Sequence, residues 1–219
     1  MSAPKLDQTP GRRLVAGIGA FQETADIILA SGSPRRKELL QSTGINFRVI
    51  PSCVAEPAPV PGESPAGYAL RMARLKVLGV AASHPGAFIL GADTVVAVDN
   101  IILGKPRDTA DARRMLGMLA GRGHIVATGC ALADSRGKVV WAEAFTSHVT
   151  FTPLTDEAIA AYAATGEPLD KAGGYAIQGL GAFMIAAIKG SYTNVVGLPL
   201  AEVVAALLSL NATLPRRAS

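Results

Sequence analysis

The sequence contains few of the residues that build metal-ligand clusters or disulfide frameworks. Its 219 residues include two cysteines and three histidines. Cys53 and Cys130 lie far apart and show no CxxC spacing, and His84, His124 and His148 are dispersed. This scarcity argues against a structural zinc site or a disulfide framework, and it favours a reducing cytoplasm as the location.

Aromatic residues, long apolar runs and one common nucleotide-binding motif are also scarce or absent. Aromatics make up 5% of the chain and the net charge is only +4. No long run of Lys or Arg occurs, so a nucleic-acid-binding surface has little support. No apolar run reaches the length of a transmembrane helix. The motif GxxxxGK[ST] is missing as well, which disfavours a P-loop nucleotidase.

What the chain does contain is enough apolar residues for a sizeable core. Hydrophobic residues make up 49% and charged residues 17% of the sequence, which is typical of a globular protein. One large domain or two small lobes can form from this length. We expect a poorly ordered extension at 1–24, a folded domain at 25–210 and a basic tail at 211–219. Arg12-Arg13 precedes an apolar stretch, but that stretch is short and acidic residues follow it, which disfavours a signal sequence.

The most informative stretch is a short apolar run that turns sharply into a basic helix. Residues 27–29 predict a buried strand, and a helix follows the Ser-Gly-Ser-Pro turn at 31–34. Backbone N–H groups at such a helix start suit an anion, and an anion would also explain cations that otherwise oppose the helix macrodipole. The alternative is an N-cap at Ser33, Pro34 at N1 and a basic turn in solvent. The polar side chains of this unit are Ser31, Ser33, Arg35, Arg36 and Lys37.

Apolar periodicity and turn residues predict alternating strands and helices along the rest of the chain. A Pro-rich loop follows a strand at 47–50, and Asp99-Asn100 suits a two-residue hairpin turn. Because two hairpins interrupt the alternation, we expect a mixed, twisted α/β sheet and not a purely parallel one. The glycine-rich residues 166–197 are expected to be irregular. Helices are expected at 64–82, at 109–119, from 155 onward and at 200–210, and further strands at 88–90, 95–98, 101–103, 125–133 and 138–151.

Two acidic residues are candidates for metal binding or proton transfer. Asp93 follows the apolar residues 88–92, at the end of a predicted strand, where open α/β sheets place ligand-binding groups. A carboxylate there can hold a divalent metal or accept a proton from water, although an Asp that caps a turn beside Thr94 fits the same pattern. Glu56 is a lone acid in a Pro-rich loop, and its isolation alone fits a solvated loop residue better.

Two further side chains lie where glycine or proline restricts the neighbouring backbone. Lys105, between Gly104 and Pro106, suits a phosphate-facing lysine and an exposed turn equally well. Gln178 precedes Gly179, so its backbone can approach a ligand closely. Its amide offers a donor and an acceptor that match the imide edge of a pyrimidine base, but a structural role for that amide is an equal alternative.

Taken together, these stretches resemble the Maf family of nucleotide pyrophosphatases over residues 26–210. Several motifs that occur in the right order are far more specific than any single one. The matching motifs are Ala30-Ser31-Gly32-Ser33-Pro34-Arg35-Arg36, Glu56 after the second strand, Arg71-Met72-Ala73 with Lys76, Gly91-Ala92-Asp93-Thr94-Val95, Gly104-Lys105-Pro106, and the stretch from Gly166 to Pro199.

The resemblance implies an elongated α/β fold with a central cleft between two lobes, similar to the inosine triphosphate pyrophosphatases. It implies hydrolysis of a nucleoside triphosphate between the α- and β-phosphates with Mg²⁺ or Mn²⁺, by a protein that is commonly a homodimer. Carried over to this chain, Asp93 becomes the proton acceptor. Arg35, Thr94 and Gln178 fall on positions that the family links to substrate choice.

The chemistry of phosphoanhydride hydrolysis agrees with these residues. It needs cations around the triphosphate, a metal that bridges its oxygens and a base that orients water. Glu56 and Asp93 are expected to hold the metal, and Asp93 is also the candidate base; the two roles compete for one carboxylate, and the sequence does not decide between them. The expected cations are Arg35, Arg36, Lys76, Lys105 and Lys171, the expected catalytic residues are Asp93, Lys105, Glu56 and Lys76, and further substrate-binding candidates are Ser31, Ser33, Thr94 and Gln178.

The loop at 170–179 (DKAGGYAIQG) resembles the branch of the family that acts on dTTP and UTP. Lys171 stands where the 7-methyl-GTP branch typically has a cysteine. Ala55 departs from the many members that place an acid before the Glu, which leaves Glu56 and Asp93 as the main carboxylates. We therefore expect a dTTP/UTP pyrophosphatase. The alternatives are the same reaction on 7-methyl-GTP or another modified nucleotide, and a non-catalytic nucleotide-binding regulator of cell division.

Overall fold

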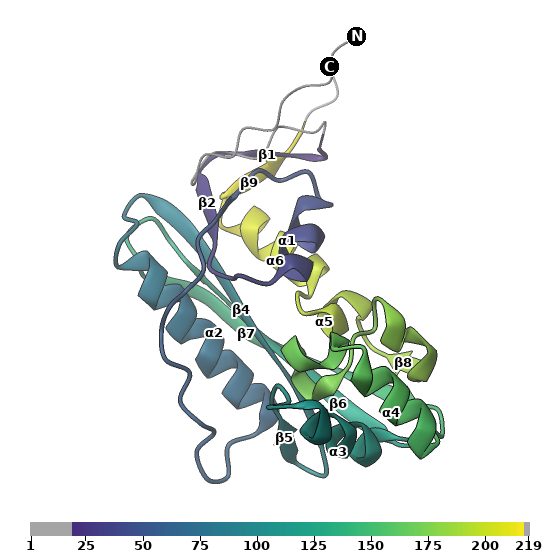
Figure 1. Cartoon of the computed structure of the whole chain (residues 1–219). Coiled ribbons are helices and arrows are strands. Elements are labelled where there is room, and N and C mark those ends of the chain that lie inside the picture. The colour runs from purple at the N-terminus through teal and green to yellow at the C-terminus, as the bar shows by residue number, and fades with distance from the viewer. Residues whose placement is uncertain (1–18, 217–219) are drawn as a thin grey trace, which may run out of the picture.

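A computed structural model of the chain describes residues 19–216, which form an elongated mixed α/β fold (Figure 1). The strands are β1 (Phe21–Glu23), β2 (Asp26–Leu29), β3 (Arg48–Val49), β4 (Ala87–Val98), β5 (Ile101–Leu103), β6 (Gly123–Ala133), β7 (Val139–Phe151), β8 (Ile185–Lys189) and β9 (Thr213–Pro215). The helices are α1 (Pro34–Gln41), α2 (Pro65–Ala81), α3 (Thr109–Leu119), α4 (Asp156–Ala164), α5 (Tyr192–Val196) and α6 (Leu200–Ser209). Short 3₁₀ helices follow α4: η1 (Glu167–Asp170), η2 (Ala172–Gly174) and η3 (Leu180–Met184).

The main sheet contains both parallel and antiparallel strand pairs, which confirms the expected mixed sheet. Its order is β3-β2-β4-β6-β7-β8, and β5 pairs with the far end of β4. β2 runs parallel to β3 and β4, whereas the other pairs are antiparallel. The long strands β4, β6 and β7 extend along most of the molecule (Figure 1).

One edge of β4 has no partner strand over its middle residues. β2 pairs with β4 only as far as Leu90, and β5 begins to pair at Val96. Within the described part of the chain, residues 91–95 are therefore open on this edge, although β6 pairs with them on the other. Because successive side chains of a strand point to opposite faces, Asp93 and Thr94 can approach the open edge from both faces of the sheet.

The helices cover the sheet in three groups. α2 packs on one face, where Ile28, Ile89 and Ala131 are buried beneath it. On the opposite face, α1 and α6 pack near the β2 end in one hydrophobic cluster, and α3 and α4 pack near the β5 end in another. These last two groups stand on either side of the open edge of β4. Between residues 19 and 216, no helix is both long and apolar enough to cross a membrane.

Local sequence signals set the helix starts and the tight hairpin as expected. Asp99 and Asn100 have φ angles of 51° and 61° in the turn between β4 and β5, where a type I′ hairpin needs positive φ at both positions. The helices α1, α2, α3 and α4 begin with an N-cap side chain that accepts a hydrogen bond from the backbone N–H three residues later, which satisfies a donor that the helix itself leaves free. These caps are Ser33, Ser64, Asp108 and Thr155.

The chain ends and the glycine-rich stretch contain more structure than the sequence suggested. β1 lies in the expected extension 1–24 and pairs with β9, which lies in the expected tail 211–219. These two strands form a small sheet of their own. The rest of the two segments, residues 1–18 and 217–219, falls outside the described residues. Within the stretch 166–197, β8 extends the main sheet beside β7, and α5 follows it.

Candidate active site

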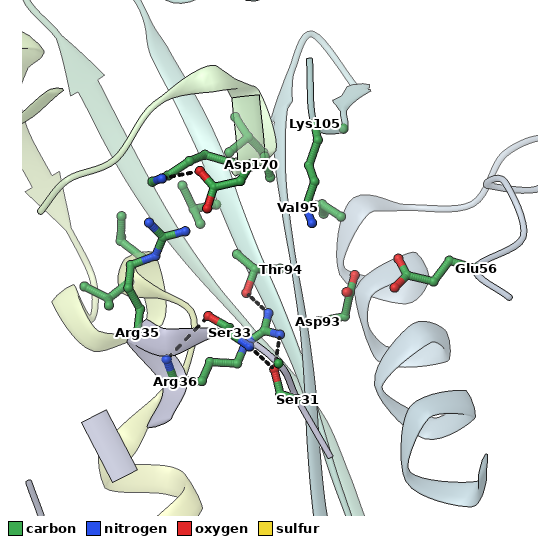
Figure 2. A pocket seen from close by; sticks show the side chains of 18 of the residues that line it. Ser31, Ser33, Arg35, Arg36, Glu56, Asp93, Thr94, Val95, Lys105 and Asp170 are labelled. Carbon is green, nitrogen blue, oxygen red and sulfur yellow. Dashed lines mark hydrogen bonds and ion pairs between the residues drawn. The ribbon is translucent and has the colours of Figure 1, made fainter. Parts of the chain in front are cut away.

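A cleft of about 760 Å³ lies beside the open edge of β4, between the start of α1 and the loop after α4 (Figure 2). Its walls come from the turn before α1, the Pro-rich loop, the start and middle of α2, the turn after β5 and the loop after α4. The cleft therefore brings together segments that are far apart in the sequence. The expected site residues that line it are Ser31, Ser33, Arg35, Arg36, Glu56, Lys76, Asp93, Thr94, Lys105 and Lys171.

Three segments of the chain hold the guanidinium group of Arg36, in the first turn of α1, in place in the cleft. Arg36 donates from Nε to the carbonyl of Gly197 (2.8 Å), from Nη1 to Ser31 Oγ (3.2 Å) and from Nη2 to Thr94 Oγ1 (2.9 Å). Ser33 Oγ accepts from the backbone N–H of Arg36 and caps the helix. Burial lowers the pKa of Arg36, and the nearby Asp93 charge acts against this shift. The N-cap interpretation of Ser33 is confirmed, and it coexists with a cationic cleft.

Thr94 belongs to a buried relay of hydroxyl groups. Thr128, which is fully buried, donates its only hydroxyl proton to the carbonyl of Asn194 (3.0 Å). Its oxygen must therefore accept the proton of Thr94, 2.9 Å away, while Thr94 accepts from Arg36. Thr94 has no proton left to donate to a ligand. Its position in the cleft is explained by the orientation it gives to Arg36.

The two candidate carboxylates share one lysine. Lys76 Nζ on α2 lies 2.6 Å from Asp93 Oδ1 and 2.8 Å from Glu56 Oε1. Because both oxygens contact one nitrogen, the carboxylates are close together, as Figure 2 shows for Asp93 and Glu56. The Asp93 and Lys76 side chains are only 11% and 13% exposed, whereas Glu56 is 52% exposed. Asp93 and Lys76 thus form a largely buried ion pair, and Glu56 beside them is exposed to solvent.

This pair of carboxylates fits a magnesium or manganese ion better than a zinc ion. No group of three or more Asp, Glu, His or Cys side chains suited to a metal occurs among residues 19–216. Mg²⁺ is typically held by one or two carboxylates, with water and substrate phosphates as its other ligands. Asp93 and Glu56 supply two hard oxygen donors of this kind at the mouth of the cleft.

Two cations of the cleft remain without a protein partner. Lys105 follows β5, is exposed and points into the cleft, and Arg35 stands on the opposite wall (Figure 2). Within the described chain neither side chain forms a hydrogen bond or an ion pair. Although Asp170 interacts with Arg35 electrostatically, no ion pair among residues 19–216 neutralises either cation, so the two charges favour a polyanion in the space between them.

The loop after α4 forms an apolar wall with one buried lysine. Lys171 Nζ donates to the carbonyl of Glu167 (3.1 Å) and pairs with Asp170, and its side chain is 12% exposed. Gln178, in contrast, is exposed and is not among the residues that line the cleft. The apolar residues of this wall are Ala172, Tyr175, Ala176 and Ile177.

Sequence reasoning missed several side chains of the cleft. Tyr68 on α2 and Ser52 in the Pro-rich loop both line it, as does Tyr175. Burial, followed by the charges of Asp93 and Glu56, raises the pKa of Tyr68, so its hydroxyl stays protonated beside the two acids. The sequence around Tyr68 and Tyr175 does not distinguish either residue from an aromatic residue of the core. Their role depends on contacts between distant segments.

Comparison with known proteins places the chain in a family. The family model described as "Maf-like protein" matches residues 26–210. The chain belongs to the Maf family. Proteins named dTTP/UTP pyrophosphatase are similar along most of their length: the one from Nitratidesulfovibrio vulgaris is 50% identical over 89% of this chain and 92% of its own, and the one from Syntrophotalea carbinolica is 55% identical over 85% of each.

The Maf match includes every expected site residue that lines the cleft, and it confirms the predicted family. A third relative named dTTP/UTP pyrophosphatase, from Geobacter sulfurreducens, is 52% identical over 87% of this chain and 99% of its own. Among solved structures, a nucleoside-triphosphatase / dITP/XTP pyrophosphatase from Mycobacterium abscessus is similar at a TM-score of 0.36 and 20% identity, over 59% of this chain and 75% of that one. This last likeness is too weak to support an argument about the Maf chain.

Proposed function

We propose that this Maf chain hydrolyses dTTP and UTP to the nucleoside monophosphate and pyrophosphate. One observation supports the reaction most strongly: a nearly buried Asp93–Lys76 pair adjoins Glu56, and the unpaired cations Arg35 and Lys105 line the same cleft. The three relatives named dTTP/UTP pyrophosphatase support the substrate.

In this proposal Asp93 is the general base. Its carboxylate lies beside the open edge of β4, where a water molecule can approach it. Asp93 orients this water toward the α–β phosphoanhydride and takes up its proton, while Lys76 Nζ, 2.6 Å from Oδ1, holds the carboxylate in place. Glu56 and Asp93 would hold Mg²⁺ or Mn²⁺, which supplies charge neutralisation for the phosphate oxygens.

In this proposal the cationic side chains bind the triphosphate. Arg35 and Lys105 approach it from opposite walls, and Arg36 is held toward it by three protein acceptors. Fixed cations aimed at developing negative charge stabilise a phosphoryl-transfer transition state without further reorganisation. The charge on the leaving pyrophosphate is thereby offset on both sides of the cleft.

The apolar wall takes the nucleobase. Tyr175, Ala176 and Ile177 present a surface on which a flat ring can pack. We keep Lys171 and Gln178 as candidates for the choice of base. Gln178 lies outside the cleft lining, so its contact with a base requires the loop to close over the ligand.

Product analysis tests the reaction. Purified protein is incubated with Mg²⁺, Mn²⁺ or EDTA and with each common NTP and dNTP, together with 5-methyl-UTP and 7-methyl-GTP. We expect pyrophosphate and monophosphate, fastest from dTTP and UTP, and no turnover with EDTA. Release of orthophosphate would refute cleavage between the α- and β-phosphates. If 7-methyl-GTP is hydrolysed fastest, it replaces dTTP and UTP as the proposed substrate. Nucleotide binding without turnover would favour a regulator of cell division.

The variant Asp93→Asn tests the base. We expect kcat to fall by about three orders of magnitude or more, because the amide cannot take up the proton of water. Asp111→Asn is the matched control, since Asp111 is also buried and paired with an arginine, but lies on α3 and does not line the cleft. Near wild-type turnover by Asp93→Asn would exclude this role.

We also propose a homodimer that works in the cytoplasm. Leu169, Leu180 and Phe183 expose 40%, 61% and 56% of their surface on neighbouring turns after α4, and apolar groups of this size commonly mark an interface. A free, exposed Cys53 suits a reducing compartment. Light scattering of the wild type and of Phe183→Ser gives the test: the wild type should have twice the chain mass, and the variant should dissociate.

A further inference from the structure

A carboxylate outside the cleft holds the loop after α4, which forms the apolar wall of the cleft. Glu167 stands at the start of this loop, and its side chain accepts from the backbone N–H groups of Leu180 (3.2 Å) and Gly181 (3.1 Å) at the loop's end. It also accepts from the hydroxyl of Tyr162 on α4 (2.7 Å). One side chain thus joins both ends of residues 168–179 to a helix.

The direction of each hydrogen bond in this cluster is determined. Tyr162 donates its only proton to Glu167, so its oxygen accepts from the backbone N–H of Ala176 (3.2 Å), in the middle of the loop. Burial and the hydrogen bond to Glu167 raise the pKa of Tyr162, so the proton stays in place. We call Glu167, Tyr162 and the amides of residues 176, 180 and 181 the Glu167 clasp.

Two glycines make room for the clasp. A Cβ atom on Gly179 would lie 2.3 Å from Glu167 Oε1, and the φ of +107° at this position already disfavours other residues. A Cβ atom on Gly181 would lie 2.6 Å from the carbonyl oxygen of Ala176 and 2.7 Å from the Tyr162 hydroxyl. The residues around the carboxylate therefore match it in shape as well as in hydrogen-bond donors.

Neither Glu167 nor Tyr162 lines the cleft, whereas the residues between the clasped points do. We propose that Glu167 is a positioning residue. Through Tyr162 and the loop amides it holds the wall formed by Tyr175, Ala176 and Ile177 in the position in the cleft that a pyrimidine base requires. This proposal rests on the proposed function for the identity of the ligand. It assigns base selectivity to a group that does not touch the base.

The test separates the clasp from general stability. Tyr162→Phe removes one hydroxyl and keeps the ring, and Glu167→Gln introduces an amide NH₂ where only donors surround the side chain. Because a hydrogen bond to a charged group contributes on the order of tenfold or more to an equilibrium, we expect KM for dTTP to rise about tenfold. The preference for dTTP over dGTP should fall by a similar factor, while kcat stays within about twofold. Glu157→Gln on α4 and Tyr192→Phe on α5 change the same groups at exposed positions and should leave both quantities unchanged.

Amide hydrogen exchange gives a readout that needs no turnover. In the wild type the amides of Ala176, Leu180 and Gly181 should be protected, and in Tyr162→Phe the protection of Ala176 should fall about tenfold. Loss of this protection with unchanged KM and unchanged base preference would overturn the proposal. If the wild type hydrolyses neither dTTP nor UTP, the proposed function fails, yet exchange together with the affinity for bound nucleotide still tests the clasp.

Discussion

Thr128 shows how a neutral residue behind the cleft can control a charged one inside it. Its hydroxyl is the link between the carbonyl of Asn194 and Thr94, and Thr94 in turn orients Arg36. The direction of all three hydrogen bonds follows from the single proton on each hydroxyl group. Removal of the Thr128 hydroxyl should therefore disturb the Arg36 guanidinium, although Thr128 does not contact it directly.

We expect Thr128→Val to raise KM for dTTP by about tenfold and to lower the free energy of unfolding by about 1–2 kcal/mol, since the Asn194 carbonyl loses one of its two donors and Thr94 loses its acceptor. Thr128→Ser retains the hydroxyl and should restore KM while it stays slightly destabilised. Steady-state kinetics and urea unfolding of both variants supply the measurements. Equal KM values in the valine and serine variants would contradict the relay.

At this scale the sequence predicted most of the charged residues that line the cleft, but not the contacts among them. Ser33 and Arg36 follow from a local pattern, a strand that turns into a capped helix. The pairing of Lys76 with both Asp93 and Glu56 joins three segments through the fold, and no spacing in the chain reveals it. The position of Gln178 outside the cleft depends on the course of a loop that glycines allow but do not determine.

Among the secondary-structure elements, the contact between α2 and β6 leaves no room for a side chain at one position. A Cβ atom on Gly129 of β6 would lie 2.3 Å from the backbone nitrogen of Leu70 and 2.4 Å from the carbonyl group of Ala69. Backbone atoms of a helix cannot give way as the end of a flexible side chain can. The close packing of α2 on the sheet, which brings Lys76 to Asp93, thus depends on a glycine.

Gly129→Ala should lower the free energy of unfolding by about 2 kcal/mol or more, because the helix must move away from the sheet. Gly117→Ala is the opposite case. Gly117 is an exposed residue within α3, and a Cβ atom there meets nothing within 4 Å, so alanine should stabilise by about 0.5–1 kcal/mol. Chemical denaturation of the two variants beside the wild type decides the matter, and a Gly129→Ala variant as stable as Gly117→Ala would refute the packing argument.

Elements with strong local signals were the ones that the sequence predicted well. α2 and α3 have capping residues and apolar periodicity, and both begin where expected. β8 and β9 were missed, because short strands gain their stability from a partner strand that is distant in the sequence. The open edge of β4 was equally invisible, since it results from where β2 stops and β5 starts.

For the molecule as a whole, His124 makes stability depend on pH. It is 4% exposed, contacts Phe151 and Tyr175 edge to face, and lies with Nε2 2.7 Å from the Tyr175 hydroxyl. Burial lowers the pKa of His124 from 6.5 to about 4. Below pH 6.5 the unfolded chain therefore binds a proton at His124 that the folded protein does not bind. The contribution of neutral His124 to stability is complete above the unfolded pKa and is lost as the pH falls toward 4.

Between about pH 7.5 and pH 5 we expect the free energy of unfolding to fall by about 2 kcal/mol through this group. The carboxyl groups whose pKa is lowered by arginine neighbours, such as Asp111 and Asp134, lose their contribution only at lower pH. Urea unfolding at several pH values measures the slope, and His124→Gln should remove most of it. An unchanged slope in that variant would assign the dependence to other groups.

The pairing of β1 with β9 has a consequence for the order in which the protein can fold during synthesis. The cluster under α3 and α4 is built from residues 96–188 and Val195, so it can close while α6 is still being made. The cluster around β2 needs Val203, Leu207 and Ala212, and its cover needs β9. β1 thus stays unpaired until β9 has been made, and α1 with its basic first turn stays without its final support until then.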